Sequence, residues 1–195
     1  MSRSDYLYRM GDNADRCYVV RSGVFKTVTV TGSGDEYVTG FFYPGELIGF
    51  SGQAEGRFPD SAVSLSNGTA CRIRFRDLPR LWSLGAGPSF LRLIAEREQA
   101  DTLVHINLGQ KKAEVRIAGF LQQLMKRLSR LGFDPLCVPT PMSRTDLASH
   151  LGLTLESTSR VISRWKKAGV IETSRDQICI KQPDELATLA YHLFP

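Results

Sequence analysis

The stretch SRTDLASHLGLTLESTSRVISRWKKAGVIE, residues 143–172, decides the fold of the C-terminal part of this 195-residue chain. Ser143 and Thr154 each precede a segment with helical spacing of apolar residues, and hydroxyl side chains at such places are typical N-caps. Gly152 lies between the two segments, where it allows a tight turn with positive φ. Ala148 is predicted to lie where the two helices cross closely, and the apolar residues predicted to form the shared core are Leu147, Leu151, Leu153, Val161 and Ile162. The pattern predicts two short helices joined by a turn.

The residues around this pair of helices complete a recognisable layout. Downstream, VIETSRDQICIKQ (170–182) predicts two short strands around a Ser-Arg-Asp turn, and DELATLAYHLF (184–194) predicts a final amphipathic segment. Upstream, AEVRIAGFLQQLMKRLSRLG (113–132) predicts a helix with one broad apolar face, and FDPLCVPTPM (133–142) predicts a proline-containing connector. Helix, turn, helix and hairpin together predict a winged helix-turn-helix.

The first turns of the second helix carry three polar residues on one face. Glu156, Ser159 and Arg160 are related by i, i+3 and i+4, so their side chains share a patch. In the DNA major groove, a glutamate accepts a hydrogen bond from a cytosine amine, an arginine donates twice to guanine, and a serine contacts a base or phosphate. The alternative is that Glu156 and Arg160 are only a surface ion pair.

Further cations and hydroxyls near this patch are candidates for contacts to the DNA backbone. Residues 1–110 hold 12 Lys/Arg and 12 Asp/Glu, whereas residues 111–195 hold 13 and 8, so the whole net charge of +5 lies in the C-terminal part. A basic half suggests a polyanionic partner, although a basic surface without a partner would show the same count. The predicted backbone contacts are Arg144, Thr145, Ser157, Arg164, Lys166 and Lys167.

The N-terminal part has the texture of an antiparallel β-structure. Short β-type runs are separated by turn residues, as at GSGD (32–35), and such runs predict a β-roll or jelly roll. The runs are RCYVVRSG, VFKTVTVTGSGDEYVTGFF, GELIGF and SAVSLSNGTACRIRF.

A run without Gly or Pro, FLRLIAEREQADTLVHINL (90–108), follows and predicts one long helix. Its seam of Phe90, Ile94, Val104 and Leu108 has near-heptad spacing, interrupted by charged residues, which suggests a helix that pairs weakly with its own copy. The alternative is a helix packed on its own β-domain.

Charged residues of this helix are candidates for controlling dimerisation. Glu98 and Asp101 would approach their own copies across a two-fold axis, where like charges oppose association, and Arg97 could neutralise them. The predicted fold class is therefore α+β, with a β-roll at 1–85, a dimerisation helix at 86–112 and a winged helix-turn-helix at 113–195.

The motifs resemble one family over nearly the whole chain. Residues 143–172, with their ExxSR pattern, resemble the DNA-binding domain of the Fnr branch of the Crp/Fnr family. Residues 7–50 are similar to its β-roll, and KKAEVRIAGFL (111–121) to the end of its dimerisation region. The resemblance implies an activator of anaerobic or redox-responsive genes that binds TTGAT-type palindromes in double-stranded DNA as a homodimer and contacts RNA polymerase. It also implies an acid in the dimerisation helix that keeps a clusterless form monomeric.

The cyclic-nucleotide branch of this family uses an arginine, in an Arg-Ser/Thr-Ala segment, to neutralise the cyclic phosphate. This chain keeps Gly45-Glu46-Leu47 but has Asp60 before Ser61-Ala62, so a carboxylate stands where the arginine is expected. A carboxylate repels a phosphate, and only Arg57 could supply the missing charge. We therefore do not expect cyclic AMP to bind.

The Fnr branch holds a [4Fe-4S] cluster with three cysteines before the β-roll and one within it. Cys71 matches the internal ligand, but MSRSDY (1–6) holds no cysteine, and Cys17 lies in a predicted strand. No cofactor is expected in the chain as given, and a cluster would need a longer N-terminus. The alternatives are a clusterless member of the branch or a shortened form of a longer regulator, with Cys71 as a small buried residue.

The remaining features argue for a cytoplasmic, non-enzymatic protein. The four cysteines show no CxxC spacing and no signal peptide or 18-residue apolar run is present, so we expect reduced thiols, a cytoplasmic location and no membrane partner. The histidines at 105, 150 and 192 lie in separate predicted helices without HExxH, and GxSxG and GxxxxGK are missing, so no enzyme is predicted. His150 is expected to be partly exposed beside the DNA backbone. A rival hypothesis is a β-roll that binds a small ligand, with DNA binding secondary or lost.

Overall fold

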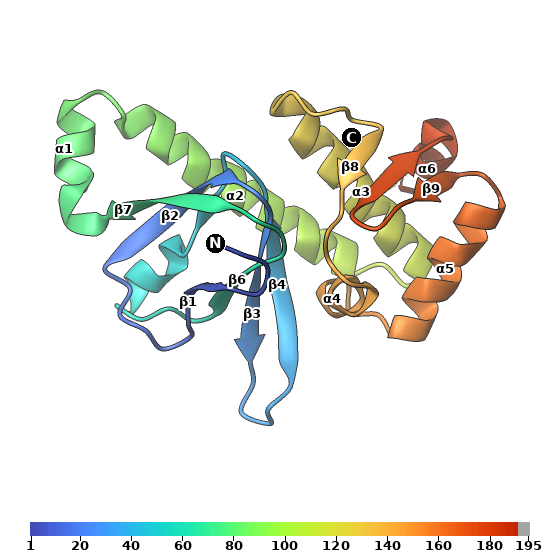
Figure 1. Ribbon diagram of the computed structural model, residues 1–195, viewed down its shortest axis with the longest axis horizontal. Helices are drawn as coiled ribbons and strands as arrows, with labels where there is room; N and C mark the ends of the chain where they lie inside the picture. Colours follow the sequence, from blue (N-terminus) through green and yellow to red (C-terminus); the bar gives the residue numbers. More distant parts are fainter. Residues whose placement is uncertain (191–195) are drawn as a thin grey trace. The chain divides into compact units, whose positions relative to one another are not determined.

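The computed structural model describes residues 1–190, which form two compact units. One unit spans Met1–Asp101 and the second begins at Thr102. The first holds antiparallel sheets and the second holds mainly helices with a small sheet, which confirms the predicted α+β class (Figure 1).

The first unit is a β-roll of two antiparallel sheets, as predicted. One sheet has the order β1-β6-β3-β4 and the other the order β5-β2-β7. In chain order the elements are β1 (Tyr6–Tyr8), β2 (Arg16–Ser22), β3 (Phe25–Val30), β4 (Glu36–Phe42), β5 (Leu47–Ile48), a 3-10 turn (Phe50–Ala54), β6 (Ser61–Ser64), β7 (Thr69–Arg74) and a second 3-10 turn (Phe75–Asp77). Gly34, at φ 89°, closes the β3–β4 hairpin, which extends beyond the other strands of the roll in Figure 1.

Aromatic side chains fill the centre of the β-roll. The ring of Tyr8 stacks on Phe58 at a centroid distance of 3.7 Å and lies 6.0 Å from the ring of Tyr18. All three belong to one buried cluster with Phe25 and Ile48. Burying aromatic rings in this way supplies much of the hydrophobic stabilisation of a small domain.

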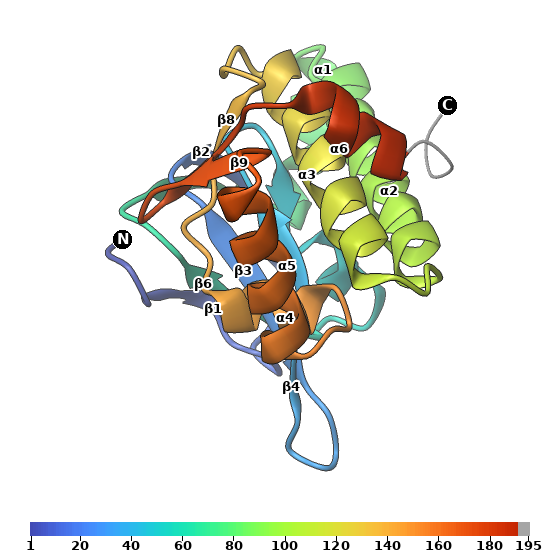
Figure 2. The same ribbon diagram turned by 90° about the vertical axis from the view of Figure 1, so that its right-hand side faces the viewer.

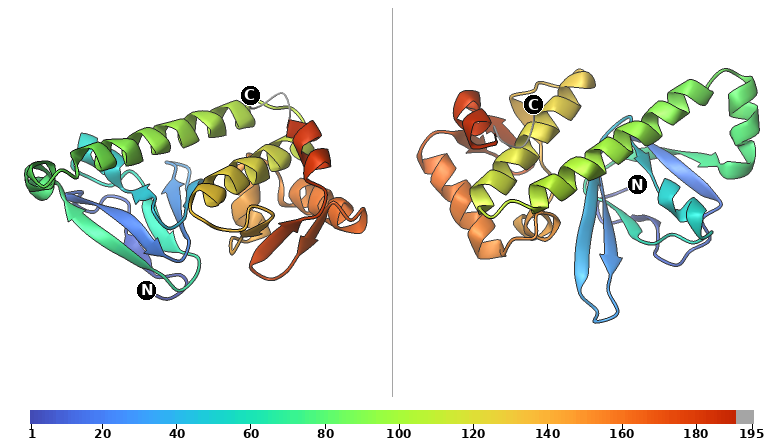
Figure 3. Two further views of the ribbon diagram at one scale, coloured as in Figure 1. Left: turned by 90° about the horizontal axis from the view of Figure 1, so that it is seen from above. Right: turned by 180° about the vertical axis from the view of Figure 1, so that it is seen from behind.

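Two helices follow the roll, α1 (Leu78–Ser83) and α2 (Gly87–Leu108). Figure 3 shows that the long α2 is unbroken. Phe90 is only 5% exposed and packs with Cys17 and Leu47 of the roll, and Ile94 lies against the same cluster. The prediction that Phe90 belongs to a dimer seam is therefore wrong, because Phe90 is buried on its own β-roll. Ile94 is only partly buried there, so its place in a dimer seam stays a prediction.

The second unit is a winged helix-turn-helix, as predicted (Figure 2). Its elements are α3 (Ala113–Arg130), β8 (Cys137–Pro139), α4 (Arg144–His150), α5 (Leu155–Lys167), β9 (Ile171–Thr173), β10 (Gln177–Ile180) and α6 (Pro183–Ala190). One face of α3 is buried, where it packs against α5 and α6. The buried residues of this face are Ile117, Ala118, Gly119, Phe120, Leu121, Leu124 and Leu128.

The small sheet has the order β8-β10-β9, so the segment predicted as a connector contributes an edge strand. In that ladder Cys137 stands directly opposite Cys179, and the two form a disulfide. The prediction that all thiols are reduced is therefore wrong for this pair. Their distance in sequence, 42 residues, concealed a pairing that only the strand register creates.

The other two cysteines are free thiols. Cys71 is exposed, whereas Cys17 is fully buried, and burial raises the pKa of the Cys17 thiol to about 12. The expectation that Cys71 is a buried apolar residue is wrong.

Of the helices in residues 1–190, none combines the length and the hydropathy that a bilayer span requires. One of the three histidines counted in the sequence, His192, lies outside the described residues.

Candidate nucleic-acid interface

The first helix of the helix-turn-helix begins with the predicted N-cap. The backbone N–H of Asp146 donates to Ser143 Oγ at 3.0 Å, and the Ser143 N–H donates to Asp146 Oδ2 at 3.0 Å, which completes a capping box. This cap fixes the first turn of α4, where Thr145 is exposed and Arg144 is half-buried. Burial lowers the pKa of Arg144, although a guanidinium stays charged in proteins.

We call the β9–β10 hairpin the wing. A cleft of about 200 Å³ lies between the start of α4 and the turn of the wing. Arg144 lines it from α4 and Arg175 lines it from the wing turn, with Ser174 and Ser143 beside them. Arg175 was not predicted as a site residue, because the Ser-Arg-Asp run was interpreted only as a turn. Two guanidinium groups around one cleft suit a phosphate oxygen.

The turn between α4 and α5 is held by a residue that the sequence analysis missed. Gly152 has the predicted positive φ, 60°. Arg116 of α3 donates from Nη1 to the carbonyls of Leu151 (2.9 Å) and Gly152 (3.0 Å), and from Nε to the Gln110 carbonyl (2.6 Å). The sequence did contain a signal for this role. Arg116 lies one helical turn before the apolar Phe120, and a charged side chain at the edge of an apolar face needs hydrogen-bond acceptors.

The second helix, α5, begins at its predicted N-cap. The Ser157 N–H donates to Thr154 Oγ1 at 3.1 Å, and Thr154 Oγ1 donates to Ser157 Oγ at 2.9 Å. A stripe of Thr158, Val161, Ile162 and Trp165 is buried. This stripe fixes the rotation of α5, so the opposite face of the helix points to solvent.

The exposed face of α5 carries the residues predicted to contact bases. The structure brings Glu156 and Arg160 together as an ion pair between Oε1 and Nη2, with side chains 77% and 73% exposed. Ser159 is half-buried beside them. An exposed i,i+4 pair stabilises a helix by only about 0.2–0.5 kcal/mol.

The cations of α5 that were predicted to contact the DNA backbone differ in their surroundings. Arg164 pairs with Glu114 of α3, so its guanidinium has a partner within the domain. Lys166 and Lys167 are exposed in the last turn of α5, where cations also suit the negative end of the helix dipole. His150, expected to be partly exposed beside DNA, is instead buried and packs edge-on against Phe120, so that prediction is wrong.

Two of the three residues predicted to control dimerisation contact each other in α2. Arg97 forms an ion pair with Asp101, and its Nε donates to Asp101 Oδ2 at 2.9 Å. The Arg97 guanidinium lies over the ring of Phe42, 4.4 Å from its centroid. Glu98, the third, is exposed.

Three side chains of the β-roll decide whether a cyclic phosphate fits. Asp60 is half-buried and accepts a hydrogen bond from the Tyr8 hydroxyl at 2.9 Å, and burial raises the pKa of both groups. The guanidinium of Arg57 is exposed and donates to the Gly11 carbonyl at 2.8 Å. A carboxylate beside a tyrosine hydroxyl supplies no positive charge for a cyclic phosphate.

Residues 1–190 hold two free thiols, Cys17 and Cys71, whereas an iron–sulfur cluster takes four thiolate ligands. Within residues 1–190, no group of three or more His, Cys, Asp or Glu side chains is arranged to hold a metal ion. Cys17 is buried on β2, and Cys71 stands on β7.

Comparisons with known proteins agree with this layout. Residues 115–189 match the Crp-like helix-turn-helix domain, and residues 1–83 match the cyclic nucleotide-binding domain. The chain is 34% identical to the fumarate and nitrate reduction regulatory proteins of Salmonella typhi and Escherichia coli K12, over 98% of this chain and 78% of each relative.

Solved structures show the same fold. FixK2 from Bradyrhizobium japonicum superposes with a TM-score of 0.81 at 22% identity, covering 96% of this chain and 93% of that one. A CRP-family transcriptional regulator from Thermus thermophilus gives a TM-score of 0.75 at 19% identity, covering 98% and 95%. The structure has a winged helix-turn-helix and a β-roll, and the sequence is 34% identical to the fumarate and nitrate reduction regulatory proteins along nearly its whole length. The chain therefore belongs to the Crp/Fnr family of DNA-binding transcription regulators.

Proposed function

We propose that this regulator is a cytoplasmic homodimer that recognises TTGAT-type palindromes and activates anaerobic or redox-responsive genes by contacting RNA polymerase. The observation that carries the proposal is the exposed Glu156–Arg160 pair on the first turns of a helix whose cap and buried stripe fix its orientation. The names of the 34% identical relatives, fumarate and nitrate reduction regulatory proteins, support the class of target genes.

In this proposal the residues that contact DNA have two roles, reading bases and holding phosphates. Arg160 donates to guanine O6 and N7, Glu156 accepts from a cytosine amine, and Ser159 contacts a neighbouring base or phosphate. Contacts to phosphates fix the register of the protein on the duplex and are independent of sequence. The residues proposed for these contacts are Arg144, Thr145, Ser157, Arg164, Lys166, Lys167 and, from the wing, Arg175.

The proposal does not involve a cofactor bound to the residues described here. The Asp60–Tyr8 hydrogen bond and the positions of Cys17 and Cys71 support neither cyclic-nucleotide nor cluster binding by these side chains. We therefore assign control of the chain to its association state and to its DNA-binding domain.

The central test is binding to operator DNA. Fluorescence anisotropy of a TTGAT-N4-ATCAA duplex and a scrambled duplex should show affinities that differ by at least about 100-fold, since specific binding by such proteins is typically about 10³-fold or more tighter than non-specific binding. Both affinities should fall as salt rises, because phosphate contacts release counterions. The titrations are made at a low and a high salt concentration. Equal affinities for the two duplexes at both concentrations would refute the proposed half-site.

The dimerisation proposal makes a separate prediction at Asp101. Replacing Asp101 with Ala removes an acid from the predicted two-fold seam, and the dimer dissociation constant should fall about fivefold, because a solvated charge pair contributes about 1 kcal/mol. The decrease in the dissociation constant should not be larger, because Arg97 already neutralises part of the charge of Asp101. Sedimentation velocity over a dilution series measures it.

Glu96→Ala provides the matched control for that experiment. Glu96 is also an acid of α2 that pairs with an arginine four residues away, Arg92, but it lies outside the predicted cluster. A dimer constant that shifts equally in both variants would mean that net charge, and not Asp101, governs association.

A further inference from the structure

We propose that Cys137 and Cys179 form a reversible thiol–disulfide switch that controls how firmly the wing is held beside the start of α4, and through this the affinity for DNA. The link to DNA rests on the proposed operator binding. The mechanical part of the proposal, which concerns the rigidity of the wing, stands without it.

The strand register places the two sulfurs together whether or not they are bonded. β8 and β10 are antiparallel, with Cys137 opposite Cys179 and Val138 opposite Ile178. The Thr140 N–H donates to the Asp176 carbonyl at 2.8 Å, and the Ile180 N–H donates to the Leu136 carbonyl at 2.7 Å.

Hydrogen-bonded and non-hydrogen-bonded pairs alternate along such a ladder, so Cys137 and Cys179 are a non-hydrogen-bonded pair. Side chains approach most closely in pairs of this kind, and the two Cα atoms are 4.0 Å apart here. The backbone bonds on either side do not depend on the sulfurs. The bond can therefore open and close again without unfolding the sheet.

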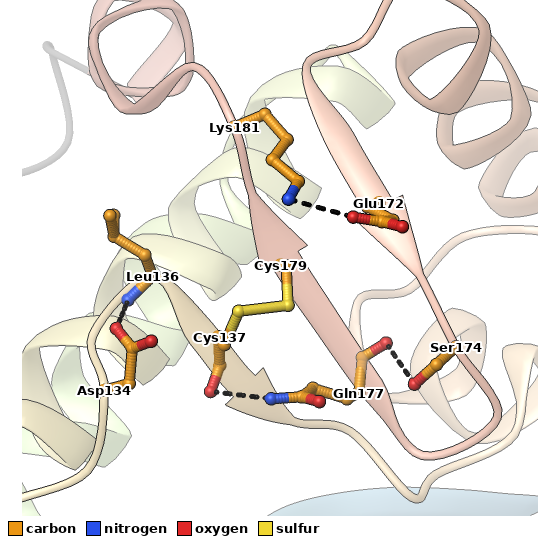
Figure 4. Close-up of a disulfide and its surroundings, with 8 residues drawn as sticks. All are labelled: Asp134, Leu136, Cys137, Glu172, Ser174, Gln177, Cys179 and Lys181. Atoms are coloured by element: carbon orange, nitrogen blue, oxygen red, sulfur yellow. Dashed lines mark hydrogen bonds and ion pairs between the residues drawn. A yellow bond between two sulfur atoms is a disulfide. The ribbon is translucent and has the colours of Figure 1, made fainter.

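The disulfide lies on the outer face of the wing sheet, where small thiols can reach it. Val138, Ile178 and Ile180 are buried in the core. Cys137 and Cys179 alternate with them along the strands, so they lie on the opposite face of the sheet, where they are half-buried. Figure 4 shows the bond between them. The exposed ion pair of Lys181 with Glu172, 2.9 Å, lies on the same face. The bond thus adds little to the hydrophobic core, in contrast to a disulfide that staples a core together.

The position of the bond connects it to the two arginines of the cleft. Cys137 stands seven residues before Arg144, and Cys179 stands four residues after Arg175. β8 is an edge strand, so after reduction it is held to β10 by the short backbone ladder and its two flanking hydrogen bonds, without a covalent link. Reduction should therefore loosen the spacing of Arg144 and Arg175, and a less preorganised pair binds phosphate more weakly.

The chemistry of the switch is ordinary thiol–disulfide exchange with a low-molecular-weight thiol such as glutathione. A glutathione thiolate attacks one protein sulfur, the protein S–S bond breaks, and a mixed disulfide forms while the other sulfur leaves as thiolate and takes up a proton. A second glutathione thiolate then releases glutathione disulfide and the second protein thiol. The protein gains two electrons and two protons, and glutathione disulfide drives the reverse reaction. In the proposed cytoplasmic location, a disulfide is usually transient and redox-sensing.

The test uses the 195-residue chain with Cys71→Ser, so that the exposed free thiol does not interfere. The protein is equilibrated with glutathione disulfide or with tris(2-carboxyethyl)phosphine, and intact mass, amide hydrogen exchange and operator anisotropy are measured on both forms. We expect a mass difference of two hydrogens, faster exchange of residues 137–145 and 174–180 after reduction, and operator affinity about three- to tenfold tighter in the oxidised form. A variant that adds Cys137→Ser and Cys179→Ser should keep the reduced behaviour in both buffers.

The outcomes separate the switch from the proposed function. The switch would be overturned if the thiols stayed reduced in glutathione disulfide. It would also be overturned if the disulfide formed and neither the amide hydrogen exchange nor the affinity for DNA changed. Redox-dependent exchange with equal binding to operator and scrambled duplexes would support the switch and refute operator recognition.

Discussion

The Arg160→Ala variant is expected to bind the TTGAT duplex roughly 10- to 100-fold more weakly than the wild type, and the scrambled duplex nearly as well as before. The reason is that a bidentate contact from arginine to guanine contributes about 1–3 kcal/mol of discrimination, whereas non-specific binding depends on the summed phosphate contacts. The fold should be intact, since the Arg160 side chain is 73% exposed and its ion pair is with the similarly exposed Glu156 one turn away. Anisotropy titrations with both duplexes measure the two affinities.

A matched control and a base substitution sharpen this prediction. Arg130→Ala removes one exposed cation from the last turn of α3 in the same unit, and it should change both affinities by no more than about twofold. Replacing the guanine of each half-site should weaken the wild type but leave Arg160→Ala almost unaffected. If Arg160→Ala weakens both duplexes equally, Arg160 contacts a phosphate and the proposed base contact is wrong.

The local signals in the sequence were sufficient to predict the helix-turn-helix. Ser143, Gly152 and Thr154 each act through their own backbone or a neighbour within three residues, so their roles as caps and turn follow from the residue type and its place. The buried stripe of α5 follows from its spacing in the same way. Glu156 and Arg160 meet because four residues span about one helical turn, which no tertiary contact needs to enforce.

Features that depend on distant partners were not predictable in this way. β8 has only three residues and lies in a proline-containing segment, and it becomes a strand because β10 pairs with it. The Cys137–Cys179 bond follows from that register. Phe90 and Ile94 have a spacing that suits either a partner helix or the β-roll, and only the structure shows that the roll buries Phe90 and covers part of Ile94.

Replacing Arg116 with Ala is expected to lower the free energy of unfolding of the winged unit by about 2–4 kcal/mol. Three backbone carbonyls, of Gln110, Leu151 and Gly152, lose a charged donor, and a hydrogen bond to a charged group contributes about 1.5–3 kcal/mol. The total is smaller than three such bonds because Gly152 is exposed and its carbonyl can bond to water. Urea denaturation followed by Trp165 fluorescence, in a Trp82→Phe background, measures the change in this unit.

Two further variants show that the geometry of Arg116 matters beyond its charge. Arg116→Lys keeps the charge but offers a single ammonium in place of the planar fork, so it should recover less than about half of the lost stability. Arg130→Ala on the same helix should change stability by less than about 0.5 kcal/mol, since its side chain is exposed. Operator affinity should fall in Arg116→Ala even under conditions where the unit is fully folded, because these bonds fix the turn from which α5 begins. An unfolding free energy within about 1 kcal/mol of the wild type would show that water replaces all three bonds and that the packing of α3 against α5, not Arg116, orients the recognition helix.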